Sequence, residues 1–158
     1  MRKTNNLTKL LAFVLSLVMM CSMSVSAFAA EVADVEYVQD NENGEVVTID
    51  LDEVFATAEE VNPNVRSFTL GSSTYKMYNI GTLSAGQSVD IAVSWTPGTS
   101  PVHIGLVKSS SSTGNLLSLT GGSRSFTATV NSAGTYYLMI ANPSTSVDLL
   151  VSYLGYSK

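Results

Sequence analysis

From Ser67 onward, the chain alternates short stretches of β-branched and aromatic residues with clusters of Gly, Ser, Asn and Pro. Stretches of this composition, bounded by turn-forming residues, are typical of β-strands. The pattern predicts strands near residues 66–70, 75–80, 87–95, 102–108, 115–119, 124–130, 135–141 and 147–154. Seven or eight short strands with such turns predict an all-β fold, a jelly-roll-like antiparallel β-sandwich.

Two of these stretches alternate strictly between apolar and polar positions. Their apolar positions are Val89, Ile91, Val93 and Trp95 in the first, and Phe126, Ala128 and Val130 in the second. Successive side chains of a strand point to opposite faces of a sheet. Each of these two strands is therefore expected to bury one face and to leave the other in water.

The last two stretches break this alternation, because Tyr136–Ala141 and Leu149–Val151 are apolar on both faces. Three explanations stay open for what covers the second face. The strand can lie in the middle of a bowed sheet, a helix near residues 54–61 can fold back over it, or a partner protein can cover it.

The first thirty residues have the composition of a secretory signal peptide. The positive charges are Arg2, Lys3 and Lys9, the apolar core is Leu10–Met20, and the small residues of a cleavage site are in Ala27-Phe28-Ala29. We expect cleavage after Ala29 or Ala30, and a secreted or cell-wall-associated product without a membrane span. A retained anchor is disfavoured by the serines that interrupt the apolar run. A lipoprotein at Cys21 is disfavoured because Met20 is not small.

Charge is distributed unevenly along the remaining chain. Residues 31–65 contain eleven acidic residues and no Lys or Arg, whereas residues 66–158 contain five cations against Asp90 and Asp148. The pattern predicts an acidic arm or linker, residues 31–65, ahead of a sandwich domain, residues 66–158. Five scattered cations form no basic patch, so no nucleic-acid partner is expected.

Two local structures are predicted within this arm. Val35–Val38 and Val46–Leu51 flank Asn43-Gly44, a dipeptide typical of tight hairpin turns. A small hairpin and a disordered linker are both open interpretations. The stretch Glu53–Val61 has helix-forming composition and ends before Asn62-Pro63, which predicts one short helix.

The residues that usually carry catalysis or bind metals are scarce. His103 is the only histidine, no serine lies in a Gly-x-Ser-x-Gly turn, and Cys21 would leave with the signal peptide. We therefore expect no enzyme, no zinc site and no cofactor. The remaining enzymatic alternative combines His103 with a serine and Asp90 or Asp148. Calcium stays open, because the acidic runs at residues 40–45 and 50–53 offer oxygen ligands without matching the usual calcium loop.

Aromatic side chains supply the candidate ligand-binding residues, Trp95, Tyr75, Tyr78 and Tyr137. Aromatic rings stack on the faces of sugars in glycan-binding modules, but they also fill sandwich cores. Trp95 continues the apolar face of its strand, which favours the core, although it ends that strand next to Thr96-Pro97-Gly98.

Three stretches together resemble the bacterial pre-peptidase C-terminal domain. They are Tyr78–Ile91 with its Ala85-Gly86-Gln87 turn, Phe126–Val130, and Ala133–Ile140 with its Gly134-Thr135-Tyr136-Tyr137 sequence. The resemblance covers residues 67–154 and implies a jelly-roll-like sandwich of the kind appended to secreted peptidases and related to collagen-binding and carbohydrate-binding modules. The chain carries no peptidase segment, so we expect a free-standing copy.

These observations lead to two functional hypotheses. The first is a secreted, non-catalytic binding or accessory module for an extracellular polymer, either a glycan or a matrix or cell-wall protein. The second is a structural or regulatory partner of another exported protein, such as a peptidase.

Overall fold

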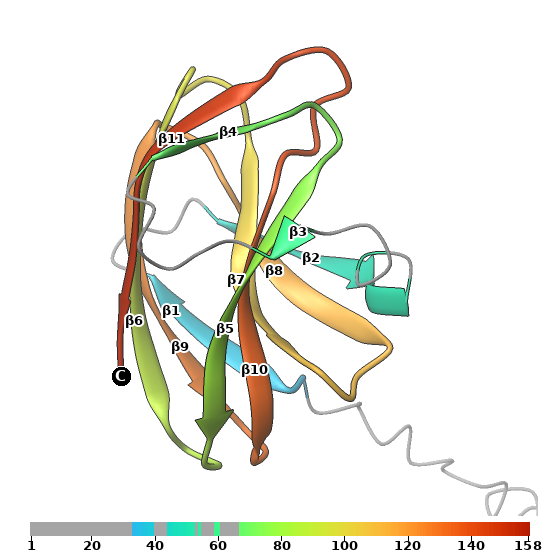
Figure 1. Ribbon diagram of the computed structural model, residues 1–158. Coiled ribbons are helices and arrows are strands. Elements are labelled where there is room, and N and C mark those ends of the chain that lie inside the picture. Colours follow the sequence, from blue (N-terminus) through green and yellow to red (C-terminus); the bar gives the residue numbers. More distant parts are fainter. Residues whose placement is uncertain (1–32, 40–43, 53, 55–58, 61–66) are drawn as a thin grey trace, which may run out of the picture. The chain divides into compact units, whose positions relative to one another are not determined.

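The computed structural model describes residues 33–39, 44–52, 54, 59–60 and 67–158 (Figure 1). The expected signal peptide, residues 1–30, lies outside the described residues. The described residues belong to one unit, Ala33–Lys158. Among them, no helix has the length and hydropathy needed to cross a membrane.

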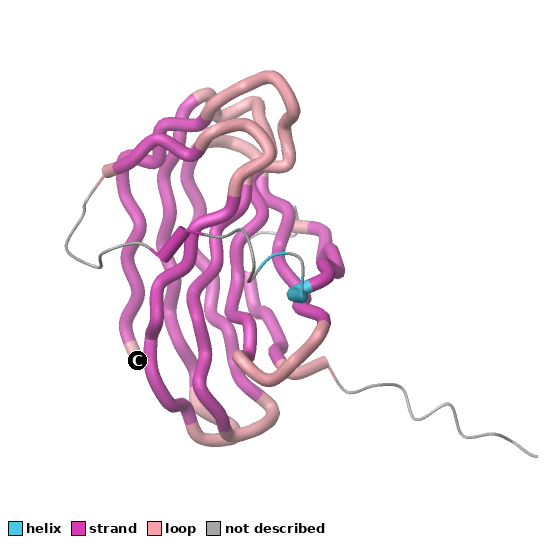
Figure 2. Tube along the Cα trace, turned by 45° about the vertical axis from the view of Figure 1, so that its right-hand side comes forward, coloured by secondary structure: helices cyan, strands magenta, loops and turns pink. Residues whose placement is uncertain are grey.

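The described residues form eleven strands. They are β1 (Val35–Gln39), β2 (Glu45–Asp50), β3 (Glu59–Glu60), β4 (Phe68–Leu70), β5 (Tyr75–Leu83), β6 (Ser88–Thr96), β7 (Val102–Lys108), β8 (Thr113–Leu119), β9 (Ser123–Val130), β10 (Gly134–Ala141) and β11 (Leu149–Ser157). Sheet A has the order β1-β9-β6-β11-β4, and sheet B has the order β2-β8-β7-β10-β5-β3. All neighbours are antiparallel except β3, which runs parallel to β5. Figures 1 and 2 show the two sheets stacked face to face.

The strand order from β4 to β11 is that of a jelly roll. β4 pairs with β11, β5 with β10, β6 with β9, and β7 with β8. The chain is thus one long nested hairpin whose successive pairs alternate between the two sheets. This arrangement confirms the predicted all-β sandwich and each of the eight strands expected after residue 66, with differences at the strand ends.

The main core lies between the sheets and follows the alternation seen in the sequence. Val89, Ile91 and Val93 of β6 are each at most 1% exposed, and Phe126 and Val130 of β9 point into the same core. Asn142 is the one buried polar residue of the described chain. Its side-chain amide donates to the carbonyls of Leu70 and Val147 at 3.1 and 2.7 Å, which ties the loop after β10 to β4.

A second apolar cluster covers the outer face of sheet B. It consists of Leu51, Val54, Met77, Val107, Leu116 and Met139. Leu51 and Val54 lie in a short helical segment, and Leu51 is fully buried. These contacts explain why β10 is apolar on both faces. β10 is a central strand of sheet B, and its outward Met139 is buried in the cluster that contains Leu51 and Val54. In β11, by contrast, the outward Leu150 stays 51% exposed.

The predicted separation of an acidic arm from the sandwich is wrong for the described residues. β1 pairs with β9 in sheet A, and β2 pairs with β8 in sheet B, so the two strands do not form the expected hairpin. Each instead extends the edge of a different sheet, where its backbone finds hydrogen-bond partners and side chains such as Val35 become buried. The sandwich therefore begins before residue 66.

The predicted helix at residues 53–61 is only partly correct. Helical structure begins at Leu51, where the carboxylate of Asp50 accepts a hydrogen bond from the Asp52 amide at 2.9 Å and so caps the turn. Glu59 and Glu60 are a strand beside β5 rather than helix. Residues 53, 55–58 and 61 lie outside the described residues.

Candidate functional site

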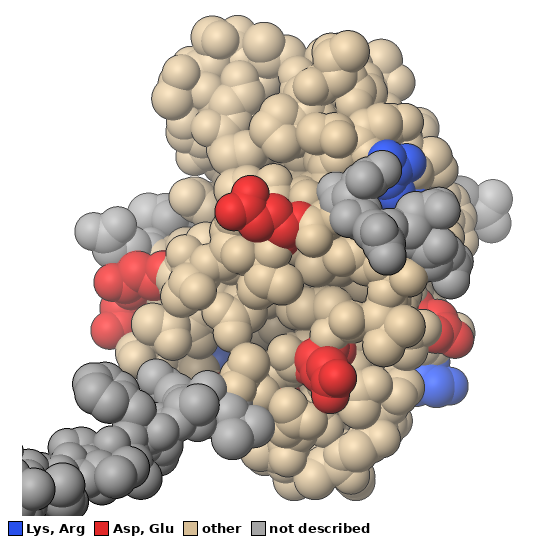
Figure 3. Space-filling model, turned by 180° about the vertical axis from the view of Figure 1, so that it is seen from behind, with Lys and Arg blue, Asp and Glu red and all other residues tan. Residues whose placement is uncertain are grey.

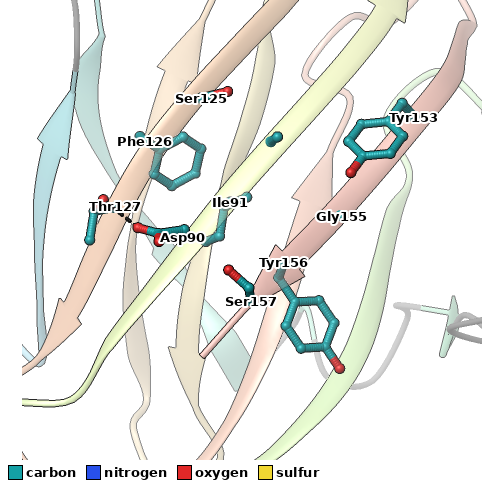
Figure 4. Close-up of a pocket in the computed structure, with 10 residues that line it drawn as sticks. Asp90, Ile91, Ser125, Phe126, Thr127, Tyr153, Gly155, Tyr156 and Ser157 are labelled. Carbon is teal, nitrogen blue, oxygen red and sulfur yellow. Dashed lines mark hydrogen bonds between the residues drawn. The ribbon is translucent and has the colours of Figure 1, made fainter.

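A shallow hollow of about 300 Å³ lies on the outer face of sheet A. Figure 4 shows that its lining comes from the neighbouring strands β9, β6 and β11. Ala92 of β6 lies opposite Ser125 of β9 on one side and opposite Gly155 of β11 on the other. Because these side chains are small or absent, the floor is recessed relative to the rest of the sheet.

One carboxylate stands at an end of this hollow. Asp90 is exposed and lies opposite Thr127 on β9 and Ser157 on β11. The Thr127 hydroxyl donates to Asp90 Oδ1 at 2.7 Å, which is the dashed line in Figure 4. No hydrogen bond to Asp90 Oδ2 is formed within the described chain, so this oxygen remains available to a ligand.

One aromatic ring, that of Tyr153, forms a wall of the hollow. Its side chain is 53% exposed, and it follows a bulge between Val151 and Tyr153 in the pairing of β11 with β6. Strict alternation would turn Tyr153 inward like Val151, and the extra residue of the bulge turns it outward instead. A Cβ atom at residue 155 would collide with the Tyr153 hydroxyl, so the glycine lets the ring lie across the floor.

Paired hydroxyl groups continue the polar surface beyond the hollow. Ser94 and Ser123 are hydrogen-bonded across β6 and β9 at 3.0 Å, and Ser88 and Thr129 are hydrogen-bonded at 2.9 Å. Among the described residues, no cation lines the hollow. Figure 3 shows that on the face it displays, the acidic and basic side chains are scattered rather than clustered. An exposed ring, one carboxylate and several hydroxyls are suited to binding a neutral polyhydroxylated ligand.

Two of the four predicted ligand-binding residues lie in the main core. Trp95 is 2% exposed and its indole N–H donates to the Ser100 carbonyl at 2.9 Å, while Tyr78 is 4% exposed. Neither ring can stack on a ligand at the surface, because the inward stripes of β6 and β5 carry them between the sheets. The prediction that Trp95 and Tyr78 bind a ligand at the surface is therefore wrong.

The other two predicted residues, Tyr75 and Tyr137, are half-buried on the outer face of sheet B. They lie on the adjacent strands β5 and β10 and pack against the second cluster. Both thus lie on the sheet opposite to the hollow, but the register does not bring them together, because Tyr137 is opposite Asn79 whereas Tyr75 is opposite Ala141. The sequence analysis did not predict the hollow. Two features of the sequence could have indicated it, Asp90 in a strand of alternating apolar and polar residues and Gly155 between the aromatic residues Tyr153 and Tyr156.

His103 lies on the outer face of sheet B, opposite Ala141 and Ser118. Burial lowers the pKa of its imidazole below the ordinary value. Asp90 belongs to the outer face of sheet A, so the sandwich separates these two members of the enzymatic alternative. Asp148 accepts a hydrogen bond from the Ser72 amide at 2.8 Å, which gives it a role in the loops.

The acidic runs considered for calcium are only partly described. Asp50 is engaged as the helix cap, and residues 40–43 and 53 lie outside the described residues. Within the part of the chain that the structure describes, no group of three or more His, Cys, Asp or Glu side chains could hold a metal ion. Comparison with models of known protein families, with curated proteins and with solved structures found no match.

Proposed function

We propose that the protein is a secreted, non-catalytic module that binds an extracellular glycan through the hollow on the outer face of sheet A. The observation that carries this proposal is the exposed Tyr153 ring lying across a glycine floor beside the Asp90 carboxylate. The signal-peptide composition of the first thirty residues supports export.

The chemistry of a sugar matches each part of the hollow. The apolar C–H face of a pyranose stacks on an aromatic ring, and its hydroxyl groups donate hydrogen bonds to a carboxylate. A volume of about 300 Å³ is at the small end of ligand sites and suits one or two sugar rings. Since Asp90 is the only charged group among the described residues of the lining, a neutral or amino sugar is favoured over a uronic acid.

The resemblance to pre-peptidase C-terminal domains supports the same proposal, because carbohydrate-binding modules are among their relatives. A single stacking ring and one carboxylate bind weakly, with a Kd on the order of 1 mM per site. We therefore expect the protein to bind polymers rather than single sugars, because a polymer presents many copies of the same sugar close together.

The test is co-sedimentation of the chain from residue 30 with insoluble peptidoglycan, cellulose, chitin, starch and collagen. Tyr153→Ala should weaken binding to the retained glycan at least tenfold, because it removes the stacking wall. Tyr75→Ala is the matched control, since it removes a half-buried tyrosine from the opposite sheet. Equal binding by the Tyr153 variant and the wild type would exclude the hollow, and retention on collagen alone would exclude a glycan.

A second candidate function is docking to another exported protein. The observation that favours it is the exposure of apolar side chains on the outer face of sheet A, with Val38 62% and Leu150 51% exposed. Cross-linking in culture supernatant tests this alternative, and a protein that stays monomeric and without a cross-linked partner would exclude it.

A further inference from the structure

Tyr37 of β1 reaches across the core and places its hydroxyl group between two strands of the opposite sheet. The hydroxyl accepts a hydrogen bond from the Leu106 amide of β7 at 3.0 Å and donates one to the Asn115 carbonyl of β8 at 2.6 Å. A Cβ atom at residue 105 would collide with this hydroxyl, so the glycine of β7 leaves room for it. One side chain of sheet A is thus bonded into the middle of sheet B.

This hydroxyl takes the place of a direct strand pair. The pairing of β7 with β8 ends two residues before Leu106 and two residues after Asn115, and the same register, if continued, puts these two residues opposite each other. The strands stay adjacent there, since a Cβ at Gly114 would lie 2.8 Å from the Val107 side chain. If the hydroxyl is withdrawn, the Leu106 amide and the Asn115 carbonyl can therefore bond to each other and continue the ladder.

The rest of β1 is attached mainly through its backbone, which pairs with β9 over five residues. Glu36 and Val38 are exposed on the outer face, whereas Val35 and Tyr37 contact the main core. An edge strand that buries so little apolar surface opens at a lower free energy than the central strands of a sandwich. Release of β1 is therefore the least costly opening that the pairing of sheet A offers on this side.

The groups that hold β1 lie within one short segment, residues 33–39. Asp34 accepts hydrogen bonds from the hydroxyl groups of Ser111 and Ser132, and the Asn131 side chain donates to the Ala33 carbonyl. Together with the Tyr37 hydroxyl and the pairing to β9, these bonds reach only residues 106–132. The segment can therefore be held in the same way by residues 106–132 of another copy.

The connection from β1 to the rest of the sandwich is short. Residues 40–43 separate Gln39, which ends β1, from Gly44, which precedes β2 in the other sheet. The Gln39 side-chain amide donates to the Gly44 carbonyl at 3.4 Å, and a Cβ at residue 44 would collide with the Gln39 side chain. Short, tight connections of this kind favour the exchange of an element between copies.

We propose that β1 is an exchangeable strand, and that the edge of β9 together with the gap between β7 and β8 binds residues 33–39 of a second copy of this chain. The second copy is the occupant because its segment is identical to the one that already fits. The exchanged contacts equal those within one copy, so the exchange costs little beyond association itself. While the edge is vacant, β7 and β8 close on each other. The dimer carries two hollows, which adds avidity for a polymer if the proposed function holds.

A pair of cysteines reports whether β1 lies on its own copy or on another. Glu36 and Thr129 are opposite each other in the pairing of β1 with β9. Their Cα atoms are about 4.5–5.5 Å apart, which suits a disulfide bond. The chain from residue 30 contains no other cysteine. Glu36→Cys/Thr129→Cys is incubated in the reduced state and then rapidly oxidised, and non-reducing electrophoresis should show a covalent dimer whose fraction rises with protein concentration.

Ser88→Cys/Thr129→Cys is the matched control. Ser88 of β6 is opposite Thr129 from a strand that stays in its own copy, so this pair should give a monomer at every concentration. Glycan binding plays no part in this assay, so its result is independent of the proposed function. If the cysteine variants do not fold, a mixture of isotope-labelled and unlabelled wild-type chains replaces them. Exchange should then give intermolecular nuclear Overhauser contacts between the rings of Tyr37 and Phe126, whose centroids are 5.8 Å apart.

Two measurements test the part played by the Tyr37 hydroxyl. Tyr37→Phe in the cysteine variant should speed formation of the covalent dimer about fivefold, because strand release no longer breaks the hydroxyl bonds. In native-state hydrogen exchange of the wild type, the Leu106 amide should be at least about tenfold better protected than the amides of β1, because it bonds to Asn115 whenever β1 is released.

The proposal is overturned if neither a covalent dimer nor an intermolecular contact forms at any concentration, or if the control pair is crosslinked between copies as readily. It is also overturned if Tyr37→Phe leaves the rate of dimer formation unchanged, or if the Leu106 amide exchanges at the rate of the β1 amides.

Discussion

Replacing Leu51 by Ala tests whether residues ahead of position 66 are part of the sandwich. Leu51 is fully buried on the outer face of sheet B, where a Cβ at Gly114 would come within 3.1 Å of its side chain. A buried Leu→Ala change costs about 2–5 kcal/mol, and about 3 kcal/mol is expected at a site so close to the surface. For a unit of the size of Ala33–Lys158, this lowers Tm by about 10 °C.

Trp95 provides the assay, because the protein's one tryptophan is buried in the main core and its fluorescence changes when water reaches it. Urea and thermal unfolding followed at this residue report the loss of the whole sandwich. Leu150→Ala is the matched control, since it makes the same chemical change at a side chain that is 51% exposed, and it should cost less than about 1 kcal/mol. A Tm shift below about 2 °C for Leu51→Ala, or an equal shift for both variants, would refute the reasoning.

Three further predictions concern other parts of the molecule. Gly155→Val should abolish glycan retention in the co-sedimentation assay, because the valine side chain displaces the Tyr153 ring. The Tm should change little, since that ring is at the surface. Unaltered retention would contradict this prediction. Asn142→Ala should cost about 2–4 kcal/mol in urea unfolding, because it leaves the carbonyls of Leu70 and Val147 without their amide donor; a loss below about 0.5 kcal/mol would contradict it. Burial lowers the folded-state pKa of His103, so its contribution to stability is present above pH 6.5, the ordinary pKa, and decreases as pH falls below that value. His103→Gln should flatten this part of the curve of unfolding free energy against pH, and an unchanged slope would show that other groups cause it.

The candidate site could be predicted from the sequence only in part. Trp95 and Tyr78 were singled out as aromatic residues, but the inward stripes of their strands bury both. Tyr153 becomes a surface ring because of a bulge, and no residue type around it marks the position of that bulge. The recess beside it depends on Ala92, Ser125 and Gly155, which come from three strands and meet only through the register of sheet A.

The sequence by itself determined the strands and their buried faces. The alternation of Val89, Ile91 and Val93 is a local property, because the pleat of a strand sends neighbouring side chains to opposite sides whatever the strand pairs with. The all-β class follows from the repetition of such stretches between turn residues. These features survive in the folded protein with shifts only at the strand ends.

Only the tertiary structure decided which strands pair and what covers the outer faces. β1 and β2 have strand-like composition next to a turn dipeptide, yet they extend opposite sheets because the edges of β9 and β8 offer unpaired backbone groups. The burial of Leu51 against sheet B likewise depends on residues more than fifty positions away, such as Val107 and Leu116. Such contacts are set by the free energy of the whole assembled core, which no short stretch of sequence contains.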